Sequence, residues 1–177
     1  MEVQEALQKR RSVRKYTEEK VSNEDIEKLL HAAMSGPSAV NLKPWEFCVI
    51  ENEETIEKLR GASKFTKIKA PLAIVVCGKI KALVPQPLSS FWVQDCSAAT
   101  ENILLCATDL GLGTVWCGIH PNEGPVKKVR EILDLKKNEI PLNIIWVGHP
   151  AEEPEARDQY DPECIKRYLV KELAGYE

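Results

Sequence analysis

Residues 92–118 read WVQDCSAATENILLCATDLGLGTVWCG, a long helical pattern that runs into a strand pattern. Over Trp92–Leu110 the apolar residues form so wide a stripe that we predict a helix buried on more than one side, against a core and against a partner chain. Gly111 fits a helix C-cap. Thr114–Cys117 then predicts a short strand. This order indicates a domain that mixes helices with a sheet.

The flanking segments predict further helices and strands. Helical patterns cover Val3–Lys9, a segment that Ser22 opens and Gly36-Pro37 ends, Asn52–Leu59 and Pro125–Leu133. Strand patterns cover Trp45–Ile50, Ala70–Cys77 and Asn143–Val147. We expect loops over 35–44 and 78–90, and a last helical turn near Glu163–Leu169. Because the 177 residues contain no repeat and no linker, the sequence predicts one α/β-type domain, residues 1–177, with a small sheet.

Composition restricts the classes of function. The chain is 44% hydrophobic and 29% charged, as globular proteins are, and its net charge of −3 favours neither nucleic acid nor an acidic membrane as a partner. The longest clean apolar run, Leu72–Cys77, is far below the ~20 residues that span a bilayer. The N-terminus lacks the apolar core of a secretory signal. We therefore expect a cytoplasmic protein whose six cysteines stay reduced.

Several common kinds of active site find no support. The three histidines, His31, His120 and His149, lack metal-ligand spacing with Cys, Asp or Glu. The chain contains neither a P-loop nor a G-x-S-x-G motif. We expect no metal site and no protein nucleophile.

A basic cluster near the N-terminus is the first candidate for ligand binding. The run Arg10-Arg11-Ser12-Val13-Arg14 places three guanidiniums and a hydroxyl within five residues. Guanidinium groups match phosphate bidentately, and an anion would relieve their mutual repulsion. Taken alone, the run fits a solvated basic edge as well. Arg157 fits either a distant phosphate ligand or a surface ion pair.

Two further segments are candidates for ligand binding, one around Pro37 and Asn41 and one rich in glycine. Residues 37–45, Pro-Ser-Ala-Val-Asn-Leu-Lys-Pro-Trp, lack a regular pattern, and the Asn41 amide could read an imide edge such as that of a flavin. A plain connector to a core tryptophan is the alternative. Glycines in 111–118 would let the backbone approach a ligand. A helix cap leading into a strand explains them too, and the helix-then-strand order excludes a dinucleotide fingerprint.

Taken together and in order, these segments resemble the nitroreductase family of FMN enzymes. The resemblance runs from about residue 2 to 168. Its matching pieces are Arg10-Arg11-Ser12-Val13-Arg14-Lys15-Tyr16, Pro37-Ser38-Ala39-Val40-Asn41 with Pro44-Trp45, Trp92-Val93-Gln94-Asp95, Gly111-Leu112-Gly113-Thr114-Val115-Trp116, and Gly148-x-Pro150 with Arg157.

The resemblance implies an α+β, nitroreductase-like fold with a central, mainly antiparallel sheet flanked by helices. It implies an intertwined homodimer with FMN at the interface, in which about residues 151–177 form a C-terminal arm on the partner subunit. The resemblance assigns three sets of residues to FMN. The phosphate, ribityl chain and ring N1–O2 edge would be bound by Arg10, Arg11, Ser12, Arg14 and Arg157. The ring would be lined from the other subunit by Pro37, Ser38, Ala39 and Asn41, and its N5 and O4 would face the backbone of Val115, Trp116, Cys117 and Gly118.

The implied reaction passes hydride from NAD(P)H through FMN to a nitroaromatic or quinone, with ping-pong kinetics and with Arg14 tuning the ring. Several alternative functions remain compatible with the sequence. Three are other flavin reactions: flavin fragmentation, reductive dehalogenation and ene reduction. Two are not catalytic: a flavin-binding module, and a scaffold that binds an anionic partner through residues 10–15. Thr114–Cys117 lacks the acidic side chain that some family branches place near N5. The short 78–90 segment predicts a reduced lid over the substrate pocket.

Overall fold

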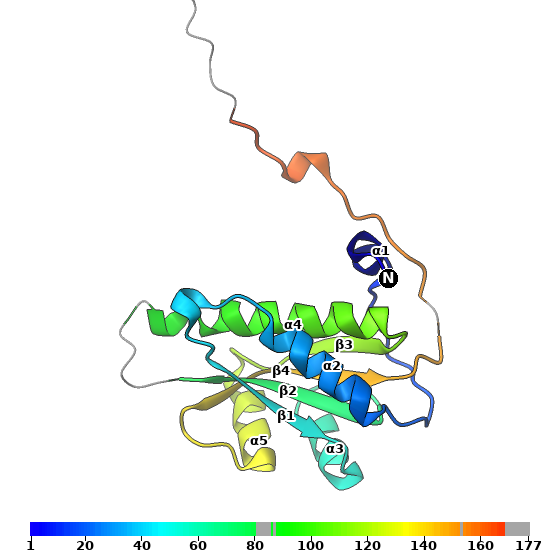
Figure 1. Cartoon of the computed structure of the whole chain (residues 1–177). Coiled ribbons are helices and arrows are strands. Elements are labelled where there is room, and N and C mark those ends of the chain that lie inside the picture. The colour runs from blue at the N-terminus through cyan, green and yellow to red at the C-terminus, as the bar shows by residue number, and fades with distance from the viewer. Residues whose placement is uncertain (81–85, 87, 153, 169–177) are drawn as a thin grey trace, which may run out of the picture.

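A four-stranded antiparallel sheet forms the centre of the molecule, in a computed structural model that describes residues 1–80, 86, 88–152 and 154–168. Its strands, in spatial order, are β1 (Trp45–Ile50), β2 (Leu72–Lys79), β4 (Glu139–Gly148) and β3 (Gly113–Gly118). Figure 1 shows helices on both faces of this sheet. The predicted antiparallel sheet flanked by helices is therefore confirmed.

Among the described residues, five α-helices surround the sheet or lie beside it. Two of them, α2 and α4, pack together over one face, and α3 and α5 cover the other (Figure 1). Their bounds are α1 (Val3–Lys9), α2 (Asn23–Met34), α3 (Glu53–Arg60), α4 (Trp92–Asp109) and α5 (Glu123–Leu133). Two predicted boundaries have visible causes, since the Ser22 hydroxyl accepts a hydrogen bond from Asp25 N at 3.1 Å and the Asn52 side chain accepts one from Thr55 N at 3.0 Å.

Alternation along the central strands divides the core into two layers. In β2, Leu72, Ile74 and Val76 join the cluster under α2 and α4. Ala73 and Val75 point the other way, into the cluster under α3 and α5. The period of two follows from the strand pleat. Because both faces are covered, the strand is apolar from Leu72 to Cys77, as its sequence indicates.

Most predicted bounds agree with the structure to within two residues, but two predicted elements differ from it more than that. The strand β4 begins at Glu139 rather than Asn143, and its Pro141 pairs with Cys77 beside an irregularity in the register of β2. A proline is tolerated there because the register is already broken. Within the helical turn predicted at Glu163–Leu169, the structure describes residues 163–168, and Leu169 lies outside the described residues. A short 3-10 helix covers Pro162–Cys164, and residues 165–168 form no helix. Nothing packs on this exposed segment to stabilise a helix.

Other predicted segments fall partly outside the described residues. Within the expected 78–90 loop, the structure describes a 3-10 helix at Leu88–Ser90, whereas 81–85 and 87 lie outside the described residues. The same holds for Glu153 and for 169–177 of the predicted C-terminal arm. All six cysteines are free. None of the helices that the structure describes has the length and apolarity that a bilayer crossing requires.

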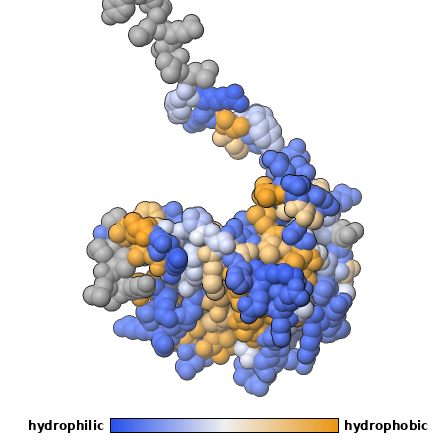
Figure 2. All heavy atoms as spheres, viewed as in Figure 1, coloured by the Kyte–Doolittle hydropathy of each residue, from blue (hydrophilic) through white to orange (hydrophobic). Residues whose placement is uncertain are grey.

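The segment after β4 leaves the body of the molecule. Residues 154–168 are exposed throughout, and Figure 1 shows them running away from the sheet and helices. Figure 2 shows hydrophobic side chains among the hydrophilic ones along this segment. Tyr160, Ile165 and Tyr168 are its exposed large hydrophobic residues. Contacts with the body lie near its start, where Ala151 N donates to the Lys15 carbonyl at 2.9 Å and the Glu155 carbonyl accepts from Arg11 Nη1 at 3.1 Å.

Candidate functional site

The arginine segment is fastened to the edge of the sheet by its one apolar member. Val13 is buried, and its backbone N–H donates to the Thr114 carbonyl at 2.8 Å. Ser12 forms a parallel bridge with the same residue of β3. Gly113 makes this approach possible, because a Cβ there would lie 2.8 Å from the Val13 side chain. The segment therefore runs along the start of β3.

The side chain of Tyr16 holds the arginine segment through hydrogen bonds to the backbone. The Tyr16 hydroxyl donates to the Val13 carbonyl at 2.6 Å and lies 3.2 Å from the carbonyl oxygen of Trp146. Burial raises the pKa of this hydroxyl, so it remains a protonated donor. Tyr16 thereby holds the turn that presents Arg14 outward, a role that the sequence alone did not assign.

The three arginines differ in how far neighbouring acceptor groups compensate their charge. Arg10 Nε lies 3.5 Å from Glu101 Oε1, and burial raises the pKa of that half-buried carboxyl while Arg10 opposes the rise. Arg11 Nη1 donates to the Glu155 carbonyl at 3.1 Å. Arg14 is exposed, and no described carboxylate lies within ion-pair distance of it. The free charge of the segment is therefore concentrated at Arg14.

The end of β3 offers backbone rather than side chains. Val115 and Cys117 point into the core under α3 and α5, whereas Trp116 packs against the opposite cluster. The Cys117 thiol lies 3.3 Å from the Phe65 carbonyl oxygen, and burial raises its pKa to about 11, with Arg14 opposing. Arg14 thus lies within electrostatic reach of Cys117. Gly118 is exposed, and a Cβ added there would meet nothing within 4 Å.

The second predicted group, Pro37–Asn41, lies in a strained turn. Ala39–Asn41 is a 3-10 helix in which Val40 and Asn41 have φ of 42° and 57°. Lys43 follows with φ 49°. Non-glycine residues adopt this left-handed region at a cost of about 1–2 kcal/mol each, and such strain gathers at functional sites.

One buried carboxylate holds this turn in place. Ala39 N donates to Asp95 Oδ1 at 2.9 Å, and Asp95, in the first turn of α4, is only 6% exposed. The Ser38 hydroxyl accepts a second bond, from Lys43 N at 3.0 Å. The sequence motif Trp92-Val93-Gln94-Asp95 contains this residue, but the motif by itself assigns it no role. A carboxylate among the apolar residues of a buried helix was the available signal.

Within one chain the predicted site residues form two separate groups. Arg10 meets α4 at Glu101 and Ala39 meets it at Asp95, roughly 9 Å apart along the helix axis. Arg157 is exposed and lies two residues after Glu155, whose carbonyl accepts a hydrogen bond from Arg11. No interaction between described residues joins the side chains of Pro37–Asn41 to those of the arginines.

We compared the sequence and the structure with those of known proteins. The model of the nitroreductase family matches residues 7–66 and 60–149. The chain belongs to the nitroreductase family. A relative from Methanothermobacter thermautotrophicus, named for NADH dehydrogenase or NAD(P)H nitroreductase activity, is 44% identical over 93% of this chain and 86% of its own length. The resemblance seen in the sequence is thereby confirmed.

Two solved structures of the family share the fold. An NADH oxidase-like protein from Clostridium acetobutylicum has a TM-score of 0.86 and 44% identity, covering 94% of this chain and 99% of that one. A nitroreductase from Desulfovibrio desulfuricans, solved in complex with FMN, has a TM-score of 0.79 and 27% identity, covering 96% and 98%. The predicted nitroreductase-like fold is therefore confirmed.

Proposed function

We propose that the protein is an FMN-dependent oxidoreductase that passes hydride from NAD(P)H to an electron-poor acceptor, a nitroaromatic or a quinone. Its nitroreductase family membership supports the reaction class, and the FMN-bound relative supports the cofactor. The observation that carries the proposal in this chain is the group of three arginines on a segment that the sheet holds in place.

The residues present fit FMN. Arg14 has no acidic partner among the described residues, and Arg10 and Arg11 are only partly answered, so a phosphate would relieve their repulsion. The exposed backbone at Gly118, the last residue of the strand along which this segment begins, leaves room for a flat ring. A solvated basic edge would not require the arginines to be braced by Val13 and Tyr16.

We assign two groups of residues to the cofactor, one from each subunit. The arginine group would hold the phosphate, ribityl chain and N1–O2 edge, and the end of β3 would face N5 and O4 through its backbone. The turn of the second subunit would line the ring. These residues are Arg10, Arg11, Ser12, Arg14, Arg157, Val115, Trp116, Cys117 and Gly118 from one chain, and Pro37, Ser38, Ala39 and Asn41 from the other.

A homodimer follows from this assignment, because the two groups are separated within one chain. The exposed apolar residues of the C-terminal segment, Tyr160, Ile165 and Tyr168, support it further. Exposed apolar side chains on an extended segment are typical of a surface that a partner covers. We propose that this segment is the arm that packs on the second subunit.

The chain's own residues bind and orient rather than react. Bound FMN would supply the redox chemistry, since flavins accept and donate hydride. Arg14 would place positive charge where negative charge develops on the reduced ring. No protein nucleophile or base is required. Because NAD(P)H and the acceptor would occupy one place in turn, we expect ping-pong kinetics.

The test is flavin uptake by the full-length protein, followed by turnover. We expect flavin absorption bands, one FMN per chain, and a dimer in sedimentation analysis. We also expect NADH or NADPH to bleach the bands and a nitroaromatic or quinone to restore them. A protein that takes up no FMN at excess contradicts the cofactor assignment. Bands that neither nicotinamide bleaches contradict the enzyme assignment and favour a flavin-binding module.

A further inference from the structure

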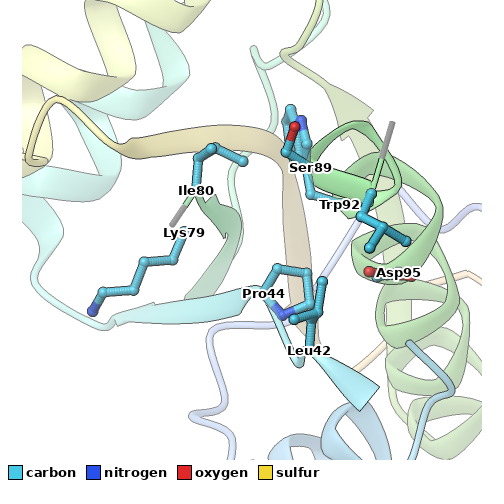
Figure 3. A pocket seen from close by; sticks show the side chains of 8 residues that line it. Leu42, Pro44, Lys79, Ile80, Ser89, Trp92 and Asp95 are labelled. Atoms are coloured by element: carbon cyan, nitrogen blue, oxygen red, sulfur yellow. The ribbon is translucent and has the colours of Figure 1, made fainter. Parts of the chain in front are cut away.

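Asp95 lies where no ligand from solution can reach it. Figure 3 shows its side chain beside a narrow space between the strained turn, the end of β2 and the start of α4. This space measures about 20 Å3, which is room for about one water molecule. Oδ2 is shielded from solvent, and no described residue donates a hydrogen bond to it. The carboxylate therefore serves the chain itself, through the bond that Oδ1 accepts from Ala39 N at 2.9 Å.

The surroundings of Asp95 hold its carboxylate in one place. Its neighbour Trp92 lies so close to β2 that a Cβ on Gly78 would overlap the indole ring, so glycine is required for this packing. Leu42 and Pro44 line the same space from the side of the turn (Figure 3). Asp95 lies in the first turn of α4, where the helix dipole favours a negative charge. A hydrogen bond to a charged oxygen is strong in such an apolar place.

The lysine beside this space does not compete with Ala39 for the carboxylate. The ammonium of Lys79 contacts the Glu46 carboxylate and lies 3.9 Å from Glu139 Oε1. Figure 3 shows Lys79 and Asp95 on different sides of the space. The charge of Asp95 therefore acts on the backbone of the turn.

The turn that Asp95 holds does not keep its shape by backbone preference. Val40, Asn41 and Lys43 have φ of 42°, 57° and 49°, a region that residues with a side chain rarely adopt. Such a backbone persists only where its surroundings hold it. Because Ala39 comes directly before the first of these residues, its bond to Asp95 fixes the point at which the strained run begins. Without that bond the run is free to relax to other shapes.

We infer that Asp95 is a positioning residue for the FMN whose phosphate the partner subunit holds. Asp95 fixes Ala39, and through Ala39 it fixes the turn that lines the flavin ring, without touching the cofactor itself. The inference rests on the proposed function, in which this turn and the arginine segment of the other chain form one site. The fraction of chains whose turn has the binding shape then sets the apparent affinity for FMN.

The link between Asp95 and the turn can be tested without the cofactor. Asp95→Asn keeps an oxygen that can accept from Ala39 N, whereas Asp95→Leu has a similar branched shape and no acceptor. Hydrogen exchange of the Ala39 amide, followed by NMR in the full-length protein, should be at least about tenfold faster in Asp95→Leu and within about threefold of the unaltered rate in Asp95→Asn. Equal exchange in all three proteins would contradict the link. Should Asp95→Leu not fold, Asp95→Ala takes its place.

The effect on the cofactor is measured on bound flavin. Asp95→Leu should weaken FMN binding at least about tenfold and change the visible circular dichroism of the bound flavin, and Asp95→Asn should restore both. Asp109→Leu is the matched control and should change neither, because Asp109 lies on the same helix but pairs with the N-terminal ammonium at 2.7 Å. Unchanged affinity and dichroism in Asp95→Leu would overturn the inference. An unaltered protein that binds no FMN would instead contradict the proposed function on which the inference rests.

A mixed dimer tests whether Asp95 acts on the site of the other chain. Chains with Asp95→Leu and chains with Arg14→Ala are co-expressed with different tags and purified as mixed dimers. If the turn of one chain completes the site of the other, one site has both halves unaltered and the second has both substitutions. We therefore expect one FMN per mixed dimer at full affinity, and no such site in either homodimer. A mixed dimer without a full-affinity site would overturn the action of Asp95 across the interface.

Discussion

The two halves of the proposed FMN site are built in opposite ways. The arginine segment is bonded along β3, with Val13 as its buried anchor and Tyr16 as its brace. The turn at Pro37–Lys43 rests on side-chain acceptors from Asp95 and Ser38, and three of its residues have left-handed backbone. Sheet bonds give the first half a fixed position without strain. The second half has a strained backbone, which persists only because contacts with its surroundings stabilise it.

The difference indicates a division of labour between the halves. A half that is fixed by the sheet suits a permanent grip on a phosphate. A strained turn suits a surface whose shape depends on what covers it, because each left-handed residue can relax when its support is lost. Substitutions can test this division from the largest expected effect to the smallest.

Removing the free charge of the fixed half should have the largest effect. Arg14→Ala should weaken FMN binding about 10–100-fold and slow reduction by NAD(P)H, because a charged hydrogen bond is lost. Fluorescence titration of FMN and stopped-flow reduction measure the two effects. Lys15→Ala is the control, since its ammonium is exposed and pairs with Glu152 at 3.1 Å. Full affinity and rate in Arg14→Ala would show that this side chain is misassigned.

Adding one methyl group at the end of β3 should have the next largest effect. A Cβ on Gly118 meets nothing within 4 Å, so Gly118→Ala should fold normally. If the ring lies there, FMN affinity should fall about tenfold through overlap. Gly124→Ala, where the nearest atom is Asn122 Oδ1 at 3.9 Å, should leave FMN affinity unchanged. Equal affinities in both variants would place the ring away from β3.

Alkaline pH should reveal the buried thiol beside the fixed half. Burial raises the pKa of Cys117 from 9.0 to about 11, so the folded state keeps a proton that the unfolded state loses. This stabilisation is complete below pH 9 and is lost as the pH rises towards 11, by about 1 kcal/mol per unit. Thermal unfolding between pH 8 and 10 should show a flatter decline for Cys117→Ala. The exposed Cys164→Ala should follow the unaltered protein; identical slopes for all three would exclude Cys117 as the cause.

Relieving the strain of the second half should give the smallest effect. Val40 is exposed with φ 42°, so Val40→Gly should stabilise the fold by ~0.5–1 kcal/mol after the entropy of glycine is counted. Calorimetry should therefore show a slightly higher Tm. Val49→Gly, an exposed valine in β1, should lower Tm instead. A lower Tm in both would mean that the turn stores no strain.

Local patterns predicted most of the elements. The strand at Trp45–Ile50 and the helix cap at Ser22 are as predicted, because alternation and capping are local signals. The start of β4 was missed because Pro141 argues against a strand, and only the neighbouring strand's irregular register accommodates it. The helical turn after Glu163 was predicted from spacing alone, with no partner to pack against.

In the candidate site too, the sequence indicated some features, whereas others depend on tertiary contacts. The grouping of Arg10, Arg11 and Arg14 and the family resemblance were legible in the sequence, because guanidinium chemistry belongs to the residues themselves. That Asp95 holds Ala39, and that this turn lies apart from the arginines, depends on α4 meeting both at different points along its length. Such contacts join residues far apart in the chain, and no local pattern encodes them. The amino-acid order thus determined the chemistry that is available, whereas tertiary packing decided which groups meet and which stay unanswered.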